Sequence, residues 1–526
     1  MASETVVIEA EEHAFTEACL ESALRVLKGA SDVAAEFDRL ADLECEICYA
    51  MASTKVLAAA RARGVPVYRL DDGSRMQLGE GRLQQRVAKG VTSRTGHIAE
   101  QIATNKAYVK TLWARVGVPI ADGQAVNDAP EAVAVAERVG WPVVIKPADS
   151  DWGLGVSMRL ADADQVQAAY RRAREYSESV LVERHLEGAW HRLLIIDDRL
   201  VAALRRDPAT VTGDGTSAIA RLVERANEDE RRGPDSRWPL RLMELGDLER
   251  EYLGRMGMGP ETVLEAGRQV VLRPIAHTDS GSISTEVSDL VHPSTVHLAR
   301  DAVKVVGLDI AGLDVIAQDI SRPLAEQGGG FLEINPYPAL FLHLEPICDR
   351  PRPVGEAIVA SLFPGTSNGR VPLFVVMGED PARALVAPLA DSLREQGVQV
   401  ATSTAFETFL GDQRLRPTGP TPADRLAAMM FHPRTEAAVL ALSPAEFFAH
   451  GLGTDQCAVL LMVGPFESQH LAALAHLPGS ARRVVVASDD HFWDETLDPA
   501  RVVRADDWVV GALKGLDRDC SSPKTS

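Results

Sequence analysis

The sequence has few cysteines, a shortage of positive charge and no long apolar run. Only 6 of its 526 residues are cysteine, which is too few and too scattered for a disulfide framework. No apolar stretch approaches the length that spans a membrane, and the opening residues, Met-Ala-Ser-Glu-Thr, lack the basic start and apolar segment of a signal peptide. We therefore expect a cytoplasmic protein with no membrane partner.

The chain also has fewer positively charged than negatively charged side chains. The chain has 55 Lys and Arg residues against 75 Asp and Glu residues, which gives a formal net charge of −20. Binding to a phosphate backbone needs clustered Lys and Arg side chains, so we expect no nucleic-acid partner. Cys45 and Cys48 form a lone CxxC pair with no second pair and no nearby histidine, and we interpret them as packing residues rather than a metal or redox site.

The composition that is present is that of a globular protein, with 46% apolar and 25% charged residues. The length favours about three domains. Short apolar strands alternate with helical patterns before a Pro- and Gly-rich break at 364–369, and a second α/β unit then begins with a strand at 371–376. We predict an α/β protein with an N-terminal segment over 1–50 and domains over 51–366 and 367–526.

The predicted strand at 331–334 introduces a candidate metal site. Glu333 and Asn335 are two residues apart on this apolar strand, so their side chains share a face. Asp314 supplies a second carboxylate upstream, and such oxygen ligands can hold Mg²⁺ against nucleotide phosphates. A solitary Glu-x-Asn also fits a turn, and the order of the neighbouring motifs is what favours metal binding.

Those motifs lie further upstream. A predicted strand at 143–145 leads into Lys146 and then into a short Gly-rich turn. Gly153 and Gly155 let backbone N–H groups approach phosphate oxygens closely, and Lys146 adds a mobile positive charge. Together with the carboxylates, they predict a site for ATP and Mg²⁺.

With these residues in view, the chain resembles the cyanophycin synthetases, which join an ATP-grasp ligase domain to a Mur-ligase-like domain. The resemblance runs through nearly the whole chain and implies an ATP-grasp fold over 51–366, preceded by a truncated N-terminal domain. It is strongest at residues 307–315, 319–324 and 333–335. Further matching strings are residues 58–66, 77–79, 182–188, 191–192, 205–206 and 213–215.

The resemblance also implies an ATP-dependent carboxylate–amine ligase. ATP would phosphorylate a carboxylate, and an amine would displace phosphate from the acyl phosphate to form a peptide bond. Mg²⁺ and cationic side chains would offset the converging negative charges. The implied residues are Asp314, Glu333 and Asn335 for Mg²⁺, Lys106 and Lys146 for phosphates, Ser150, Gly153 and Gly155 for a lid, Glu183 and Leu186 for adenine, and Arg192, Arg206 and Arg273 for anionic groups. For each arginine, a surface or structural ion pair fits equally well.

Several positions depart from the family pattern. The Gly-rich loop at 149–155 keeps only its last two glycines, and Trp190 stands where the family has an acidic residue suited to ribose. Residues 277–282 replace a segment near the substrate and introduce Asp279. These changes put the identity of the substrate in question.

The C-terminal domain also departs from its family. Where a Mur-type ligase has a P-loop, this chain has residues 378–384, in which Pro381 removes an amide donor and Glu379 and Asp380 would repel phosphate. The family's later glutamate falls at Ala441. We predict a degenerate Mur-ligase-like domain of P-loop-type α/β fold that lacks its P-loop and has a structural or subunit-packing role.

The implied partners are small. We expect amino-acid, dipeptide or peptide-polymer substrates and a homo-oligomer, either a dimer or a tetramer. The resemblance implies that both ends are shorter than in the family, so we keep a ligase that performs a single condensation in specialised metabolism as an open alternative to a polymerase. A nucleotide-binding regulatory or scaffold protein without catalysis is a second alternative, against which the retained set Asp314, Glu333 and Asn335 argues.

Overall fold

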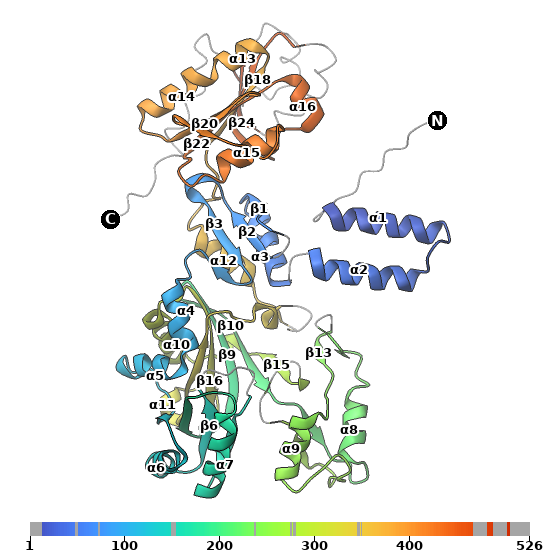
Figure 1. Cartoon of the computed structure of the whole chain (residues 1–526), viewed down its shortest axis with the longest axis vertical. Coiled ribbons are helices and arrows are strands. Elements are labelled where there is room, and N and C mark those ends of the chain that lie inside the picture. The colour runs from blue at the N-terminus through green and yellow to red at the C-terminus, as the bar shows by residue number, and fades with distance from the viewer. Residues whose placement is uncertain are drawn as a thin grey trace. The chain divides into compact units, whose positions relative to one another are not determined.

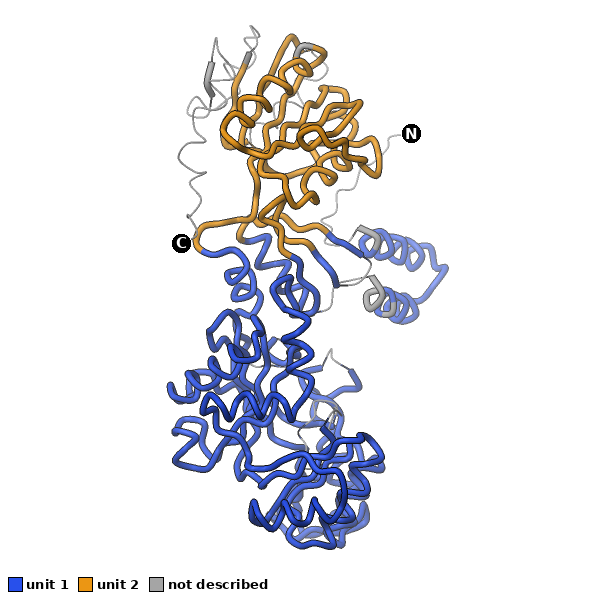
Figure 2. The backbone as a smooth tube through the Cα atoms, turned by 60° about the vertical axis from the view of Figure 1, so that its left-hand side comes forward, with its two compact units in different colours: residues 1–62, 69–76, 86–364 blue, residues 63–68, 77–85, 365–526 orange. Residues whose placement is uncertain are grey.

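The computed structural model describes residues 13–47, 51–71, 74–148, 154–235, 238–273, 276, 280–344, 348, 350–466, 481–487 and 502–504. The chain divides into two compact units (Figure 2). Unit 1 comprises residues 1–62, 69–76 and 86–364, and unit 2 comprises residues 63–68, 77–85 and 365–526. Each unit therefore draws on separate stretches of sequence. The domain boundaries proposed from the sequence stay predictions.

The central sheet of unit 1 has the strand order β15-β10-β9-β16-β17, and all of its pairs are antiparallel. Alternation along β16 sends Leu313 and Val315 into a hydrophobic core and Asp314 to the opposite face. One face of this sheet is therefore structural, and the other is free to carry polar side chains. The strands are β9 (Ala189–Ile196), β10 (Arg199–Asp207), β15 (Ile283–Glu286), β16 (Ile310–Ala317) and β17 (Gly330–Asn335).

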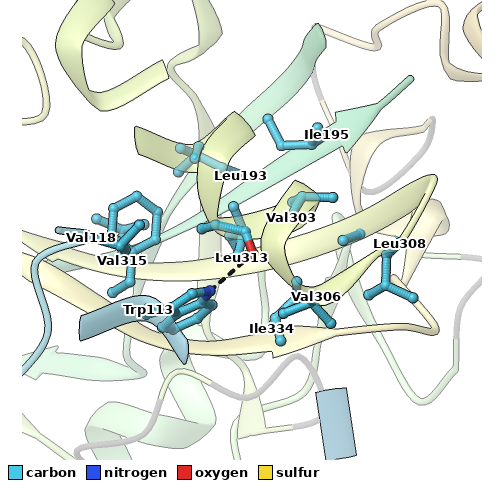
Figure 3. Close-up of a cluster of buried hydrophobic side chains, with 14 of the residues drawn as sticks. Trp113, Val118, Leu193, Ile195, Val303, Val306, Leu308, Leu313, Val315 and Ile334 are labelled. Atoms are coloured by element: carbon cyan, nitrogen blue, oxygen red, sulfur yellow. Dashed lines mark hydrogen bonds between the residues drawn. The ribbon is translucent and has the colours of Figure 1, made fainter. Parts of the chain in front are cut away.

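Helices α4 (His97–Thr104), α5 (Lys106–Arg115) and α10 (Pro293–Val306) contribute to the core on the structural face. Figure 3 shows Trp113 of α5 beside Val303 and Val306 of α10 in this core. Trp113 on α5 is fully buried, and its indole nitrogen donates a hydrogen bond of 2.9 Å to the Ala302 carbonyl of α10. The side chain of Asn105 caps α5 by accepting a hydrogen bond from the Tyr108 amide. This packing fixes α5, and with it Lys106 at its first turn.

A second lobe of unit 1 is a four-stranded sheet with the order β5-β8-β6-β7, covered by two helices (Figure 1). Asp128 and Asp162 cap these helices by accepting hydrogen bonds from the third residue of each first turn. The lobe delivers Lys146 and Glu183 on neighbouring strands. Its elements are β5 (Gly123–Val126), α6 (Ala129–Val139), β6 (Val143–Pro147), β7 (Ser157–Leu160), α7 (Ala163–Arg174) and β8 (Val180–Arg184).

The rest of unit 1 consists of smaller pieces. An insertion between β10 and β15 has its own small core, in which Leu222, Leu253 and Leu264 take part. Helix α12 packs on α3. The elements are α1 (His13–Leu27), α2 (Val33–Ile47), α3 (Met51–Ala62), β1 (Val67–Arg69), β2 (Arg75–Leu78), β3 (Gln85–Ala88), β4 (Val91–Thr92), β11 (Thr210–Thr212), α8 (Ile219–Ala226), β12 (Arg232–Gly233), β13 (Leu240–Arg241), α9 (Asp247–Arg255), β14 (Gln269–Val271), α11 (Leu324–Gln327), the 3₁₀ helices η1 (Gly81–Leu83), η3 (Ser288–Leu290) and η4 (Leu340–His343), and α12 (Val354–Leu362), with parts of β1 to β3 and all of η1 lying in segments of unit 2.

Unit 2 is an α/β layer built on the sheet order β21-β20-β19-β22-β18-β23-β24-β25. Both faces of its middle strands are buried: Val375 and Met377 of β18 enter one core with helix α15, and Phe374 and Val376 enter the other with α14. The elements are β18 (Leu373–Gly378), α13 (Asp380–Ala384), α14 (Val386–Glu395), β19 (Val400–Ser403), β20 (Thr408–Leu410), β21 (Gln413–Leu415), α15 (Pro422–Met430), β22 (Ala437–Leu442), α16 (Pro444–His450), β23 (Cys457–Val463), β24 (Ala481–Ala487) and β25 (Val502–Arg504).

Candidate active site

Three charged residues stand side by side across the open face of the central sheet. Asp314 on β16 is directly opposite Arg192 on β9 and directly opposite Glu333 on β17. The Arg192 guanidinium binds both Asp314 oxygens, with Nη2 at 3.1 Å from Oδ2. Arg192 and Asp314 are both buried, at 8% and 0% exposure. The site is thus built by strand register, and Arg192 is part of a buried ion pair.

A bulge in β17 places Glu333 and Asn335 on this face. Pairing with β16 shifts between Asp314–Glu333 and Val315–Phe331, so one extra residue is inserted at Leu332. Phe331 and Ile334 both enter the core as a result, which leaves Glu333 and Asn335 on the opposite side. The Asn335 side-chain nitrogen donates a hydrogen bond of 3.5 Å to the Gly312 carbonyl. The side-chain oxygen of Asn335 therefore remains available to a cation.

Asp314, which is fully buried, and Glu333, which is partly exposed, form a like-charged pair. Burial raises the pKa of Asp314, and the neighbouring Glu333 raises it further, although Arg192 opposes both effects. The pKa of Glu333 is lowered despite its burial, through its hydrogen bond with Asp314 and the nearby positive charges of Lys106, Arg192 and Lys146. Asp314 is buried, whereas the Glu333 side chain is 30% exposed. Two neighbouring carboxylates and a carboxamide are hard oxygen donors, and a divalent cation relieves the repulsion between the carboxylates. These residues therefore fit Mg²⁺.

This candidate site is not one of the common metal-ligand clusters. Within the described ranges, no group of three or more His, Cys, Asp or Glu side chains is arranged to hold a metal ion. Two carboxylates and one carboxamide form a smaller ligand set, which is typical of ions that also bind waters and substrate phosphates.

Two lysines, Lys110 and Lys146, contact another buried carboxylate, that of Glu183. Glu183 is 3% exposed and pairs in the sheet with Val144 of β6. Its Oε2 atom is 3.0 Å from the Lys146 ammonium, and its Oε1 atom contacts the Lys110 ammonium. Lys106 lies 3.7 Å from Glu333 Oε2. The structure thus places Lys106 beside Glu333 and Lys146 beside Glu183.

Lys110 is a site residue that the sequence analysis missed. It lies one helical turn after Lys106 on α5, and its side chain is almost completely buried. Residues four apart on a helix share a face, so the spacing from Lys106 carried a signal. The partner, Glu183, comes from a different element 73 residues away, and no spacing rule identifies it.

Of the predicted lid, only its end lies within the described residues. Ser150 and Gly153 lie outside them, as does Asp279 of the substrate segment. Gly155 has φ +71°, and a side chain there would approach Tyr176 and Pro147 to within 2.8 Å and 2.9 Å. This position requires glycine for its backbone conformation and packing, whether or not a phosphate binds. Leu186 is buried, at 8% exposure, two residues after the end of β8.

The other two candidate arginines differ in their surroundings. Arg206 on β10 is buried, with its guanidinium 5.1 Å from the ring centre of Trp190, its partner in the sheet. Trp190 therefore has a structural contact at the position where the family carries an acidic residue. Arg273 follows β14 and lies 3.9 Å from Glu249 of α9, outside the row formed by Arg192, Asp314 and Glu333.

A buried histidine, also missed from the sequence, belongs to the same neighbourhood. His343 ends the 3₁₀ helix η4, and burial, with the charges of Arg192 and Arg206, lowers its pKa to about 3. Its Nδ1 atom has no hydrogen-bond partner among the described residues. His343 is therefore a neutral imidazole at ordinary pH.

In unit 2, the turn after β18 is closely packed. Gly378 has φ +154°, and a side chain there would approach Ala382 Cβ to within 2.9 Å. Ala382 itself is fully buried in the core beneath α13. A P-loop holds its backbone amides open around phosphates, whereas this turn is filled by its own side chains.

Comparisons with known proteins match this geometry. Residues 105–198, which carry Lys106, Lys110, Lys146 and Glu183, match the family model described as the carbamoyl-phosphate synthase L chain, ATP binding domain. A cyanophycin synthetase of Trichormus variabilis is 33% identical over 421 residues, covering 80% of this chain and 47% of the relative. The chain is related to the cyanophycin synthetases. It has an ATP-grasp fold.

Other relatives extend the comparison. A cyanophycin synthetase of Synechocystis sp. is 31% identical over 485 residues, which cover 91% of this chain and 55% of the relative. The chain spans about half the length of these curated cyanophycin synthetases. Among solved structures, a bifunctional glutathione synthetase from Pasteurella multocida is 27% identical, with a TM-score of 0.47, and the match covers 63% of this chain and 46% of that one.

The described helices also bear on membrane insertion. None of them combines the length and the apolar character that a membrane span requires.

Proposed function

We propose that the chain is an ATP-dependent carboxylate–amine ligase that forms an amide bond through an acyl phosphate. The observation that carries the proposal is the in-register row of Arg192, Asp314 and Glu333, with Lys106 beside Glu333. This row places a buried arginine and a partly buried lysine next to two carboxylates suited to a divalent ion. The arrangement is what the convergence of phosphate and carboxylate charges needs. The similarity to cyanophycin synthetases supports the same reaction class.

Each predicted residue keeps a role in this proposal, in which Ser150, Gly153 and Gly155 would form a lid over the phosphates. Asp314, Glu333 and Asn335 would hold Mg²⁺, which when bound neutralises phosphate charge. Lys106 and Lys146 would bind phosphate oxygens, while Glu183 and Leu186 would line the adenine side. Arg206 and Arg273 would bind anionic groups of phosphate or substrate. Arg192 would hold Asp314 in place.

The proposed substrates are an amino acid, a dipeptide or a peptide polymer that supplies the carboxylate, and an amino compound that supplies the amine. Their identities, the homo-oligomeric state, the cytoplasmic location and the absence of nucleic-acid and membrane partners remain predictions.

The direct test is a ligation assay. The purified protein is incubated with Mg·ATP and pools of amino acids and dipeptides, and phosphate release and product mass are measured. We expect phosphate release that depends on the amine, with a product heavier than its carboxylate by the amine minus water. ATP binding without turnover across a broad pool would contradict the ligase and favour a non-catalytic nucleotide-binding protein.

A further inference from the structure

Glu183 binds two lysines, one on each of its oxygens. Lys146 of β6 lies 3.0 Å from Oε2, and Lys110 of α5 contacts Oε1. The carboxylate is 3% exposed, and the side chains of Lys110 and Lys146 are 9% and 13% exposed. Both ion pairs are therefore largely removed from water. In such a buried site, an ion pair can break at low cost only if each remaining charge keeps a partner of opposite charge.

Charge balance among these groups makes the two lysines unequal. Burial would raise the pKa of Glu183, but Lys110 and Lys146 together lower it to about 2, so the carboxylate is ionised. One carboxylate needs one cation, and the second lysine is in excess. Lys110 lies on α5, which Trp113 and the Asn105 cap hold in place. Lys146 lies one residue before the end of β6, next to the Gly-rich turn.

We propose that Lys110 is a positioning residue that keeps Glu183 neutralised while Lys146 moves from Glu183 to the nucleotide phosphates. The proposal rests on the proposed function, because it requires Lys146 to bind phosphate. A buried carboxylate that loses its last cation is strongly disfavoured. With Lys110 present, Lys146 can leave Glu183 without that cost. Without Lys110, Lys146 becomes the sole partner of Glu183 and is held back from phosphate.

The simpler interpretation is that Lys110 only ties α5 to β8. The two interpretations predict different losses of affinity for ligands with and without phosphates. A structural tie would affect the whole nucleotide pocket, so adenosine and ATP would lose affinity in parallel. A positioning role acts through Lys146, so it would affect ATP and leave adenosine, which has no phosphates, nearly unchanged. Adenosine therefore serves as the matched control ligand.

The experiment is a calorimetric titration of ATP and adenosine into the full chain and its variants. For Lys110→Met we expect ATP to bind about tenfold more weakly and adenosine to bind within about twofold of the unmodified chain. In a chain that already carries Glu183→Gln, adding Lys110→Met should change ATP affinity by less than about threefold, because no buried carboxylate then competes for Lys146. Lys304→Met is the surface control, since Lys304 is 60% exposed and pairs with Asp198.

The outcomes separate this inference from the function on which it rests. Equal losses for ATP and adenosine, an unchanged ATP affinity in Lys110→Met, or the same loss when Glu183→Gln is also present would each overturn the positioning role. If Lys146→Met binds ATP as tightly as the unmodified chain, the assignment of Lys146 to phosphate is wrong and the positioning role falls with it, whereas the proposed ligase is decided separately by the ligation assay. A loss that is confined to ATP and disappears when Glu183→Gln is also present supports the positioning role.

Discussion

At the scale of single residues, the site is organised by pairs of opposite charge, and one of these pairs, Arg192 with Asp314, is buried. Arg192 binds Asp314 with two hydrogen bonds, and Glu333 lies beside them with Lys106 at 3.7 Å. Removing either partner of such a pair leaves an uncompensated charge, whereas removing one of two neighbouring carboxylates relieves repulsion. Asp314 and Glu333 should therefore respond differently to neutralisation.

The first prediction uses this difference. Glu333→Gln should lower ligase turnover by about a hundredfold or more, the scale for loss of one transition-state stabiliser, while the melting temperature stays the same or rises. Asp314→Asn should lower turnover similarly, but should also destabilise unit 1 by about 3 kcal/mol because it leaves Arg192 buried without its partner. Phosphate release and thermal melting measure both effects. Near-normal turnover of Glu333→Gln would remove the basis of the metal assignment.

The sequence allowed part of this site to be predicted. Side-chain alternation was enough to put Glu333 and Asn335 on one face, because it depends only on neighbouring residues. The pairing of Arg192 with Asp314 depends on the register of strands 122 residues apart, and the contact of Lys110 with Glu183 joins a helix to a strand. Such contacts follow from tertiary packing, which local patterns do not encode.

At the scale of elements, short apolar runs were good predictors of strands. The predicted strand at 331–334 lies within β17, and the predicted strand at 143–145 lies within β6. The predicted strand at 371–376 corresponds to β18, which begins and ends two residues later, at Leu373 and Gly378. The apolar run of this strand extends to Met377. The bulge at Leu332 was not predictable, because it arises from pairing with β16.

The second prediction concerns the turn that precedes β7. Gly155 and Gly140 lie in the same lobe with φ +71° and φ +86°, but only Gly155 has close neighbours, whereas nothing lies within 4 Å of a side chain placed at Gly140. Gly140→Ala should cost about 1 kcal/mol of stability through backbone strain alone. Gly155→Ala should cost about 1 to 3 kcal/mol more through overpacking against Tyr176 and Pro147. Urea unfolding measures the difference, and equal losses would show that Gly155 is not crowded.

At the scale of the whole molecule, unit 2 contains a buried acid that makes its stability depend on pH. Glu80 is 4% exposed, accepts a hydrogen bond of 3.1 Å from Tyr68 and lies 4.0 Å from Arg370. Burial raises its pKa to about 7 even though Arg370 and Tyr68 oppose the change. Because the folded pKa lies above the unfolded value, the protonated form is favoured by folding.

The third prediction follows from that sign. The stabilising contribution of Glu80 should be complete below about pH 4.5 and should be lost as the pH rises to about 7, with no further change above. Glu80→Gln, which imitates the protonated acid, should therefore gain on the order of 2 to 3 kcal/mol relative to the unmodified chain between pH 4.5 and pH 8. Denaturant unfolding at several pH values tests this, with the exposed Glu407→Gln as control. A variant difference that does not change with pH would contradict it.

The last prediction is that the whole chain binds one nucleotide, in unit 1. In a doubly wound sheet such as that of unit 2, ligands bind at the carboxyl ends of the middle strands, where β18 leads into α13. Here Ala382 fills that turn, Pro381 removes an amide donor, and Glu379 and Asp380 add negative charge.

At this turn, the carboxylates of Glu379 and Asp380 would therefore repel a phosphate group, and the packed side chain of Ala382 would leave it no space. Calorimetric titration of ATP with Mg²⁺ should give about one site per chain, and Lys146→Ala should abolish it or weaken it at least about tenfold, as expected for the loss of a charge-assisted contact in a partly buried site. The C-terminal unit should remain folded in that variant, since Lys146 lies in unit 1. A second tight site that survives Lys146→Ala would show that the turn after β18 opens to bind phosphate.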